Sequence, residues 1–131
     1  MQRLTGIFCG RTDDGGFIES GYVGARETCE RLAIQFESVD QIDIAPDALA
    51  AAIDAAAVSR PDLMVVHGGR SDEAVAIAGP RHPQIRFLST HGEFAGANYS
   101  CFTIAQPQSA FLAGALEIGR ASCRDRVCLA V

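Results

Sequence analysis

Short apolar runs alternate with helical patterns along most of this chain, and that alternation limits the possible folds more than any other feature. Strands are predicted over residues 4–9, 34–39, 63–66, 85–88 and 98–103, and helices after residue 16, from 46, from 71 and over 106–116. Strands that alternate with helices predict a parallel sheet with right-handed crossovers. We therefore expect an α/β fold, a three-layer parallel sheet with helices on both faces.

Local signals support the predicted helices. The first helix carries an apolar stripe at spacings of three and four residues, which is typical of a surface helix: Ile18, Tyr22, Ala25, Cys29 and Leu32. Pro46 suits the first turn of the second helix, because a proline lacks the N–H that would have no partner there. Ser71 is predicted as the N-cap of the third, with Asp72 and Glu73 in its first turn. Three large apolar residues are expected in the core: Phe102, Phe111 and Leu112.

The composition excludes several classes of protein. With 131 residues, the chain is long enough for one compact domain or one lobe of a larger protein. The net charge is −5 and the 11 basic residues, all Arg, form no cluster, which argues against nucleic-acid binding. No apolar run approaches the roughly 20 residues of a transmembrane helix. No secretory signal peptide is found in the short apolar segment at the start of the chain.

The cysteines and histidines suggest neither a metal site nor a disulfide framework. The five cysteines form no CxxC pair, and the three histidines are not grouped with them. Cys9, Cys29 and Cys101 each fall in an apolar pattern, so we expect small buried side chains there. No metal and no cofactor are expected.

The end of the chain differs from what precedes it. Residues 1–117 hold 15 acidic and 8 basic side chains, whereas the last 14 residues hold one acidic and three basic. The string over 117–127 resembles a translated sequencing adaptor, with Asp125 where Glu would be expected. We interpret residues 1–116 as one lobe and 117–131 as a non-native tail without function. The alternative is an ordinary basic C-terminal helix.

Candidate binding residues lie in the loops that follow the first, third and fourth predicted strands, because ligands bind beyond the carboxyl ends of parallel strands. In the first loop, Asp13 or Asp14 could accept hydrogen bonds from a ligand, and Phe17 offers a face for stacking. The structural alternative is a helix-capping Asp and a core Phe. His67 could act as a general base, bind a ligand or bond only to backbone, and no nucleophile or partner for catalysis is evident. Ser20, Gly21 and Tyr22 begin a helix and need no special role.

Three motifs in order resemble the basic membrane protein family, the PnrA-like substrate-binding proteins of ABC transporters. They are DDGGFIESGY from Asp13, HGG from His67 and QPQSAFLAG from Gln106. The resemblance covers about residues 3–116. It implies one lobe of a type I periplasmic-binding-protein fold, in which two lobes close on a ligand, and members of the family bind purine nucleosides.

The resemblance also implies site residues and a location. It places Phe17 against the base and Asp14, with Asp13, as polar contacts, while the segments at His67, Gly68, Gly69 and Thr90 would face the cleft. The expected partners are a nucleoside-like small molecule and a membrane permease. The location implied is the periplasm or the outer face of the plasma membrane.

Three functions follow from these observations. The first is the N-terminal lobe of a truncated solute-binding protein, which makes and breaks no bond and therefore has no catalytic residue. The second is the effector-binding lobe of a transcriptional regulator with the same fold. The third is a small α/β enzyme that uses His67 or Asp14. Fold analogy alone does not separate them.

Overall fold

A five-stranded parallel sheet forms the centre of the computed structural model, which describes residues 2–103, 108 and 110–116. The strand order is β2-β1-β3-β4-β5. The strands are β1 (Arg3–Phe8), β2 (Gln35–Val39), β3 (Leu63–His67), β4 (Arg86–Thr90) and β5 (Tyr99–Phe102). The connections carry α1 (Phe17–Leu32), α2 (Pro46–Ala56) and α3 (Ser71–Ala78), with short 3-10 turns η1 (Ala57–Ser59) and η2 (Gly79–Arg81).

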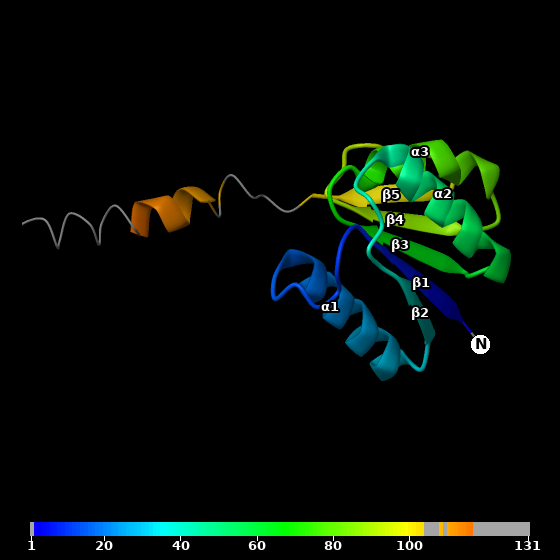
Figure 1. Cartoon of the computed structure of the whole chain (residues 1–131), viewed down its shortest axis with the longest axis horizontal. Coiled ribbons are helices and arrows are strands. Elements are labelled where there is room, and N and C mark those ends of the chain that lie inside the picture. The colour runs from blue at the N-terminus through cyan, green and yellow to red at the C-terminus, as the bar shows by residue number, and fades with distance from the viewer. Residues whose placement is uncertain (1, 104–107, 109, 117–131) are drawn as a thin grey trace, which may run out of the picture.

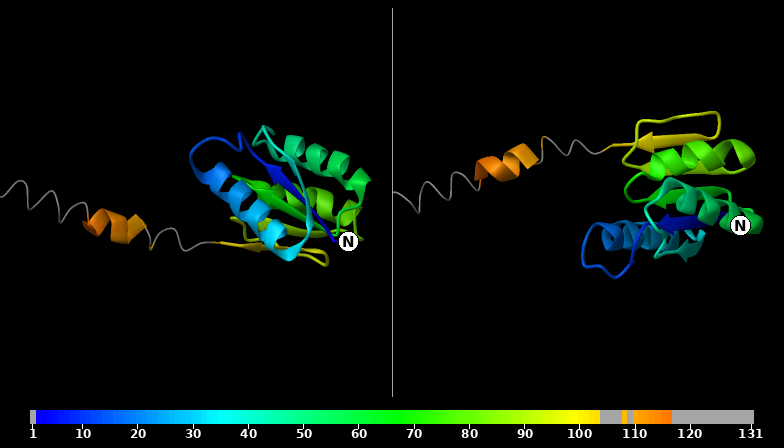
Figure 2. Two further views of the ribbon diagram at one scale, coloured as in Figure 1. Left: turned by 90° about the horizontal axis from the view of Figure 1, so that it is seen from below. Right: turned by 45° about the horizontal axis from the view of Figure 1, so that its top comes forward.

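Helices cover both faces of the sheet. Figures 1 and 2 show α1 on one face, next to β1 and β2, and α2 with α3 on the other. The three-layer α/β architecture predicted from the sequence is therefore confirmed.

The main core lies between the sheet and the pair α2–α3. Leu49 and Ile53 of α2 are fully buried there against Met64 and Val66 of β3. Successive strand residues point to opposite faces, so the neighbouring Val65 of β3 points toward α1. A continuous apolar run at β3 is thus explained by burial on both sides, as the sequence suggested.

The expectation that Ser71 caps α3 is wrong. Arg70 occupies the N-cap position, and Ser71 is the first helical residue, with its side chain fully buried. Its hydroxyl donates to the carbonyl of Thr90 at 2.9 Å and lies 2.8 Å from the hydroxyl of Ser89. Ser71 therefore joins α3 to β4, a role that depends on tertiary contact rather than on the local pattern.

Several predicted core residues are exposed. Phe102 lies on the edge strand β5 and is 47% exposed, and Phe111 and Leu112 are exposed by 75% and 63%. Leu32, in the last turn of α1, is also exposed, although the rest of its stripe is buried or half-buried. Cys29 is buried as predicted, whereas Cys9 and Cys101 are only partly buried.

The interpretation of residues 117–131 as a tail lies outside the described residues. None of the helices in the described part of the chain has both the length and the apolar character required to cross a bilayer.

Candidate functional site

The carboxyl ends of β1, β3 and β4 bring the predicted site residues to one edge of the sheet. Phe8, the last residue of β1, pairs with His67, the last residue of β3. Thr90 ends the neighbouring strand β4. The parallel register therefore places Thr90 beside His67, and the loop that leads into α1 lies at the same edge.

Aromatic rings gather at this edge. The ring of Phe17, the first residue of α1, stacks on the imidazole of His67, with centroids 4.3 Å apart and planes 28° apart. The ring of His91 lies on the same phenyl group, at 4.9 Å and 41°. Phe17 is nevertheless 43% exposed, so it is not the core residue of the structural alternative. It keeps apolar aromatic surface open to a ligand.

His67 is held at both ring nitrogens. Nε2 lies 2.9 Å from the carbonyl oxygen of Phe17, and Nδ1 lies 2.8 Å from Oγ1 of Thr90. Because a carbonyl only accepts, Nε2–H donates to Phe17, and in the neutral ring Nδ1 accepts from the Thr90 hydroxyl. Burial lowers the pKa of His67 below its ordinary 6.5, which favours this neutral form.

Gly21 makes room for this histidine, a role the sequence interpretation missed. A β-carbon at position 21 would lie 2.5 Å from Nε2 of His67, which is far inside van der Waals contact. The absence of a side chain at Gly21 therefore lets α1 approach the end of β3 closely. A glycine inside an amphipathic helix lowers helix stability by about 1 kcal/mol relative to alanine. Its presence in the helical pattern was therefore a sign in the sequence that position 21 has a packing role.

Asp14 caps α1 from just outside the helix. Its Oδ1 accepts the backbone N–H groups of Glu19 at 3.0 Å and Gly16 at 2.8 Å, and its Oδ2 accepts that of Ile18 at 3.3 Å. These bonds, first those from Glu19 and Gly16, lower the pKa of the Asp14 carboxyl. The structural alternative for Asp14, a helix cap, is thus present in the structure.

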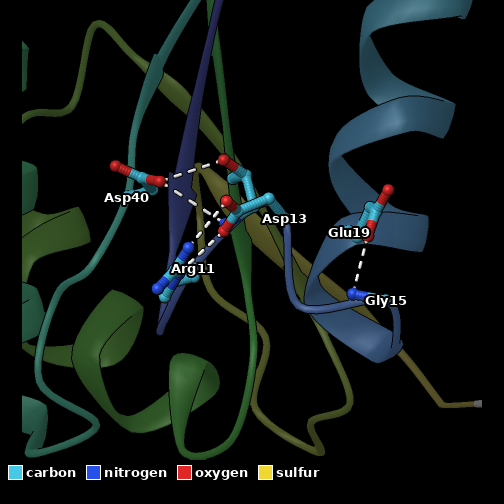
Figure 3. A network of polar contacts seen from close by, with 6 residues as sticks. Arg11, Asp13, Gly15, Glu19 and Asp40 are labelled. Carbon is cyan, nitrogen blue, oxygen red and sulfur yellow. Dashed lines mark hydrogen bonds and ion pairs between the residues drawn. The ribbon is translucent and has the colours of Figure 1, made fainter.

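The rest of this loop is fixed by its own polar side chains (Figure 3). The side-chain carboxylate of Glu19 accepts a hydrogen bond from the backbone N–H of Gly15 at 2.6 Å. Asp13 binds the guanidinium of Arg11 through two bonds of 2.8 and 2.7 Å, both partners being well exposed. Thr12 donates from its hydroxyl to Asp40 at 2.9 Å, which ties the loop to the segment after β2. The loop therefore presents Phe17 from an ordered start of α1.

Gly68 and Gly69 are packed closely by their neighbours. Gly68 has a φ of +135°, and a β-carbon there would lie 2.6 Å from Sγ of Cys9. A β-carbon on Gly69 would meet the side chain of Ile44 at 2.8 Å. Burial raises the pKa of the Cys9 thiol to about 11, which favours the protonated thiol at neutral pH.

The seven predicted site residues thus form two groups. In the first group, His67 contacts both Phe17 and Thr90 directly. The remaining four serve the loops around this cluster, by capping, ion pairing or close packing: Asp13, Asp14, Gly68 and Gly69. His91 joins the cluster although it was not among the predicted site residues. Its place on the loop after β4 was the signal that could have included it.

An apolar groove of about 430 Å³ extends from this cluster along the α1 face of the sheet. The end of the groove at the carboxyl edge is lined by Phe17, His67, Thr90, His91 and Phe102. Among the residues that the structure describes, no group of three His, Cys, Asp or Glu side chains is placed to hold a metal ion. What the arrangement offers chemically is a stacking surface beside a few hydrogen-bonding groups.

No protein-family model matches this chain, and no curated protein matches it. Its fold, however, matches solved structures. A fragment from Peptoclostridium difficile 630 that is designated a lipoprotein superposes with a TM-score of 0.67. The match covers 89% of this chain and 97% of the fragment, at 18% sequence identity.

Two longer proteins share the fold. An ABC transporter solute-binding protein from Conexibacter woesei DSM 14684 matches with a TM-score of 0.69 and 20% identity, over 79% of this chain and 35% of that protein. A transcriptional activator of the comK gene from Bacillus halodurans matches with a TM-score of 0.63 and 17% identity, over 77% of this chain and 34% of the activator. The chain thus spans about a third of either protein. At such identities the likeness establishes the fold alone, a parallel α/β fold found in both the solute-binding protein and the activator.

Proposed function

We propose that this chain forms one lobe of a solute-binding protein of an ABC importer and holds a small ligand at the carboxyl edge of its sheet. The fold supports this assignment, because a solute-binding protein shares it. In such an arrangement a second lobe closes over the ligand, and the loaded protein delivers it to a membrane permease. Both the second lobe and the permease belong to the proposal, as does a location outside the cytoplasmic membrane.

The cluster at Phe17 supports a proposal for the ligand class. A phenyl ring that contacts two imidazoles and is still 43% exposed is suited to stack on a planar ring of a solute. We infer a purine nucleoside, in agreement with the resemblance to the PnrA-like family. The single observation that carries this proposal is the stack of Phe17 on His67, with Phe17 still open to solvent.

A binding role without catalysis fits the hydrogen bonds of His67. Both ring nitrogens have protein partners, Phe17 and Thr90, so neither is free to take a proton from a substrate. Asp14 likewise uses its carboxylate to cap α1. The two residues that an α/β enzyme would have used are therefore engaged in holding the site together.

Titration calorimetry of the whole chain against adenosine, guanosine, uridine, ribose and a neutral amino acid tests the proposal. We expect heat from the purine nucleosides and none from ribose, because only the base offers a face to Phe17. Binding of ribose or the amino acid in place of any nucleoside would contradict the ligand class. Turnover of any of these compounds would contradict the non-catalytic role.

The second candidate is the effector-binding lobe of a transcriptional regulator, favoured by the match to the comK activator. Ligand binding would be shared by both functions, so the titration does not separate them. The coding sequence around this segment can separate the importer from the regulator. A second α/β lobe without a DNA-binding segment in the longer reading frame supports the importer, whereas an adjoining helix-turn-helix segment supports the regulator.

A further inference from the structure

His91 directly follows β4 and lies at the same carboxyl edge as Phe17 and His67. The centroids of the His91 and Phe17 rings are 4.9 Å apart, and both side chains line the same end of the groove. A solute ring that stacks on the open part of Phe17 would therefore be a neighbour of the His91 imidazole. This arrangement puts a polar group next to the proposed stacking surface.

The polar side chains around Phe17 differ in the hydrogen bonds that they already make. His67 is bonded through both ring nitrogens, and Ser20 donates to the Phe17 carbonyl at 2.7 Å. His91 is half-buried, and within the described part of the chain its side chain makes no hydrogen bond, yet no buried side-chain nitrogen there is left unpaired. The ring nitrogens of His91 are therefore open to solvent. They can bond a ligand without breaking a bond within the protein.

The backbone of His91 is held in an uncommon conformation. Its φ is +63°, in the left-handed region that side chains other than glycine rarely adopt, although histidine does so more often than most. Two hydrogen bonds fix the loop. The N–H of His91 donates to the carbonyl of Phe102 at 2.8 Å, and the N–H of Glu93 donates to the carboxylate of Asp72 at 3.2 Å. Backbone strain of this kind concentrates at functional sites, where it positions a side chain before a ligand arrives.

We propose that His91 donates a hydrogen bond to a ring nitrogen of the base that stacks on Phe17, and so selects a heteroaromatic base over an apolar ring of similar shape. The inference rests on the nucleoside-binding role proposed above. The chemistry is complementary, because a neutral imidazole carries one N–H donor and the unsubstituted ring nitrogens of adenine accept. Stacking on Phe17 tolerates any planar ring, whereas a hydrogen bond from His91 recognises the edge of the ring.

Analogues of adenosine that lack one ring nitrogen test this hydrogen bond. Titration calorimetry of the whole chain compares adenosine with 1-deaza-, 3-deaza- and 7-deazaadenosine. We expect one of these analogues to bind about threefold to tenfold more weakly than adenosine, the effect of losing one hydrogen bond. His91→Leu should remove this difference. His91→Gln carries an amide donor on a side chain of similar length and should retain part of it.

The two substitutions are a matched pair. Both remove the imidazole ring from Phe17 and both place an unbranched β-carbon on the same left-handed backbone, so they differ chiefly in hydrogen bonding. A difference between adenosine and the analogues that is absent from the parent chain, or that persists unchanged in His91→Leu, would overturn the proposed hydrogen bond. Nucleoside binding would then still stand, because adenosine would still give heat. No heat from adenosine in the parent chain would overturn both proposals.

Nitrogen NMR of the imidazoles provides an independent test in the parent chain. The chain has three histidines, and His82, which is bonded to Asp54 of α2 at 2.7 Å, is the internal control. Saturation with adenosine should shift a ring-nitrogen resonance of His91 and leave those of His82 in place. If adenosine gives heat in the titration while the His91 resonances stay unchanged, His91 does not bond the base and the proposal is wrong.

Discussion

Phe17 and His67 are joined twice, although 50 residues separate them in the sequence. Their rings stack with centroids 4.3 Å apart, and Nε2–H of His67 donates to the backbone carbonyl of Phe17 at 2.9 Å. The first contact fixes the plane of the phenyl ring, and the second fixes the start of α1 that carries it. The position of the proposed stacking surface thus depends on a histidine at the end of β3.

The aromatic ring of Phe17 should matter more for affinity than its volume. We expect Phe17→Leu to weaken purine-nucleoside binding by about tenfold to a hundredfold, because base stacking on an aromatic side chain contributes about 1–3 kcal/mol. Phe17→Tyr keeps the ring and should stay within a few fold of the parent chain. Titration calorimetry measures both. Equal losses in the two variants would show that the ring does not stack on the ligand.

The stability of the lobe should fall in mildly acidic solution because of His67. Burial holds the pKa of this histidine below the 6.5 of an unfolded chain. The hydrogen bond to the Phe17 carbonyl and the charge of Asp14 oppose this shift, while nearby His91 adds to it. Between the two pKa values the unfolded chain binds the proton and the folded chain does not, so the folded state loses stability as the pH falls. Above about pH 6.5 this loss is absent.

Urea unfolding at several values between about pH 5 and 8 measures the effect. The parent chain should lose free energy of unfolding below about pH 6.5, and His67→Gln should lose less over the same interval. An identical slope in both proteins would assign the pH dependence to other groups. The carboxyl of Asp14 does not confuse the result, because its lowered pKa places its titration at more acidic pH.

The fold could be predicted because its signals are local. The apolar run of β3 and the periodicity of α1 depend on neighbouring residues, and they were sufficient to establish the parallel α/β arrangement. The carboxyl-edge site followed from topology. The cluster of Phe17, His67 and Thr90 is therefore made of residues that the sequence had already indicated.

The errors concern residues whose role depends on a distant partner. Ser71 is a residue type that often caps helices, yet its hydroxyl donates a hydrogen bond to the Thr90 carbonyl of β4. Gly21 appeared to need no role, and only the approach of His67 explains it. Phe111 was placed in the core on hydrophobicity alone, whereas burial requires that its helix be seated on the sheet. No pattern within one element contains that information.

The two adjacent aspartates should differ sharply in their effect on stability. Asp14→Ala removes the acceptor of three N–H groups at the start of α1, and loss of a helix cap lowers the unfolding midpoint by about 2–8 °C in a domain of this size. Asp13→Ala removes only an exposed ion pair with Arg11, which contributes little. Thermal unfolding followed by circular dichroism compares them. Equal midpoints would contradict the capping role of Asp14.

Two glycines of α1 provide a final matched comparison, since each could be replaced by alanine in the same helix. Gly24→Ala adds a methyl group into open space, so the higher helix propensity of alanine should raise the free energy of unfolding by up to about 1 kcal/mol. Gly21→Ala receives the same gain, but its methyl group would lie 2.5 Å from Nε2 of His67 and must displace the ring.

Because that ring is bonded to both Phe17 and Thr90, its displacement breaks two hydrogen bonds and the stack. Overpacking of this kind costs about 1–3 kcal/mol, so we expect Gly21→Ala to be less stable than the parent chain even after the gain in propensity. Urea unfolding gives the sign of each change. It should be opposite for the two variants, and nucleoside affinity should fall only in Gly21→Ala. A Gly21→Ala chain as stable as Gly24→Ala, with unchanged affinity, would mean that His67 does not sit against α1 as the structure shows.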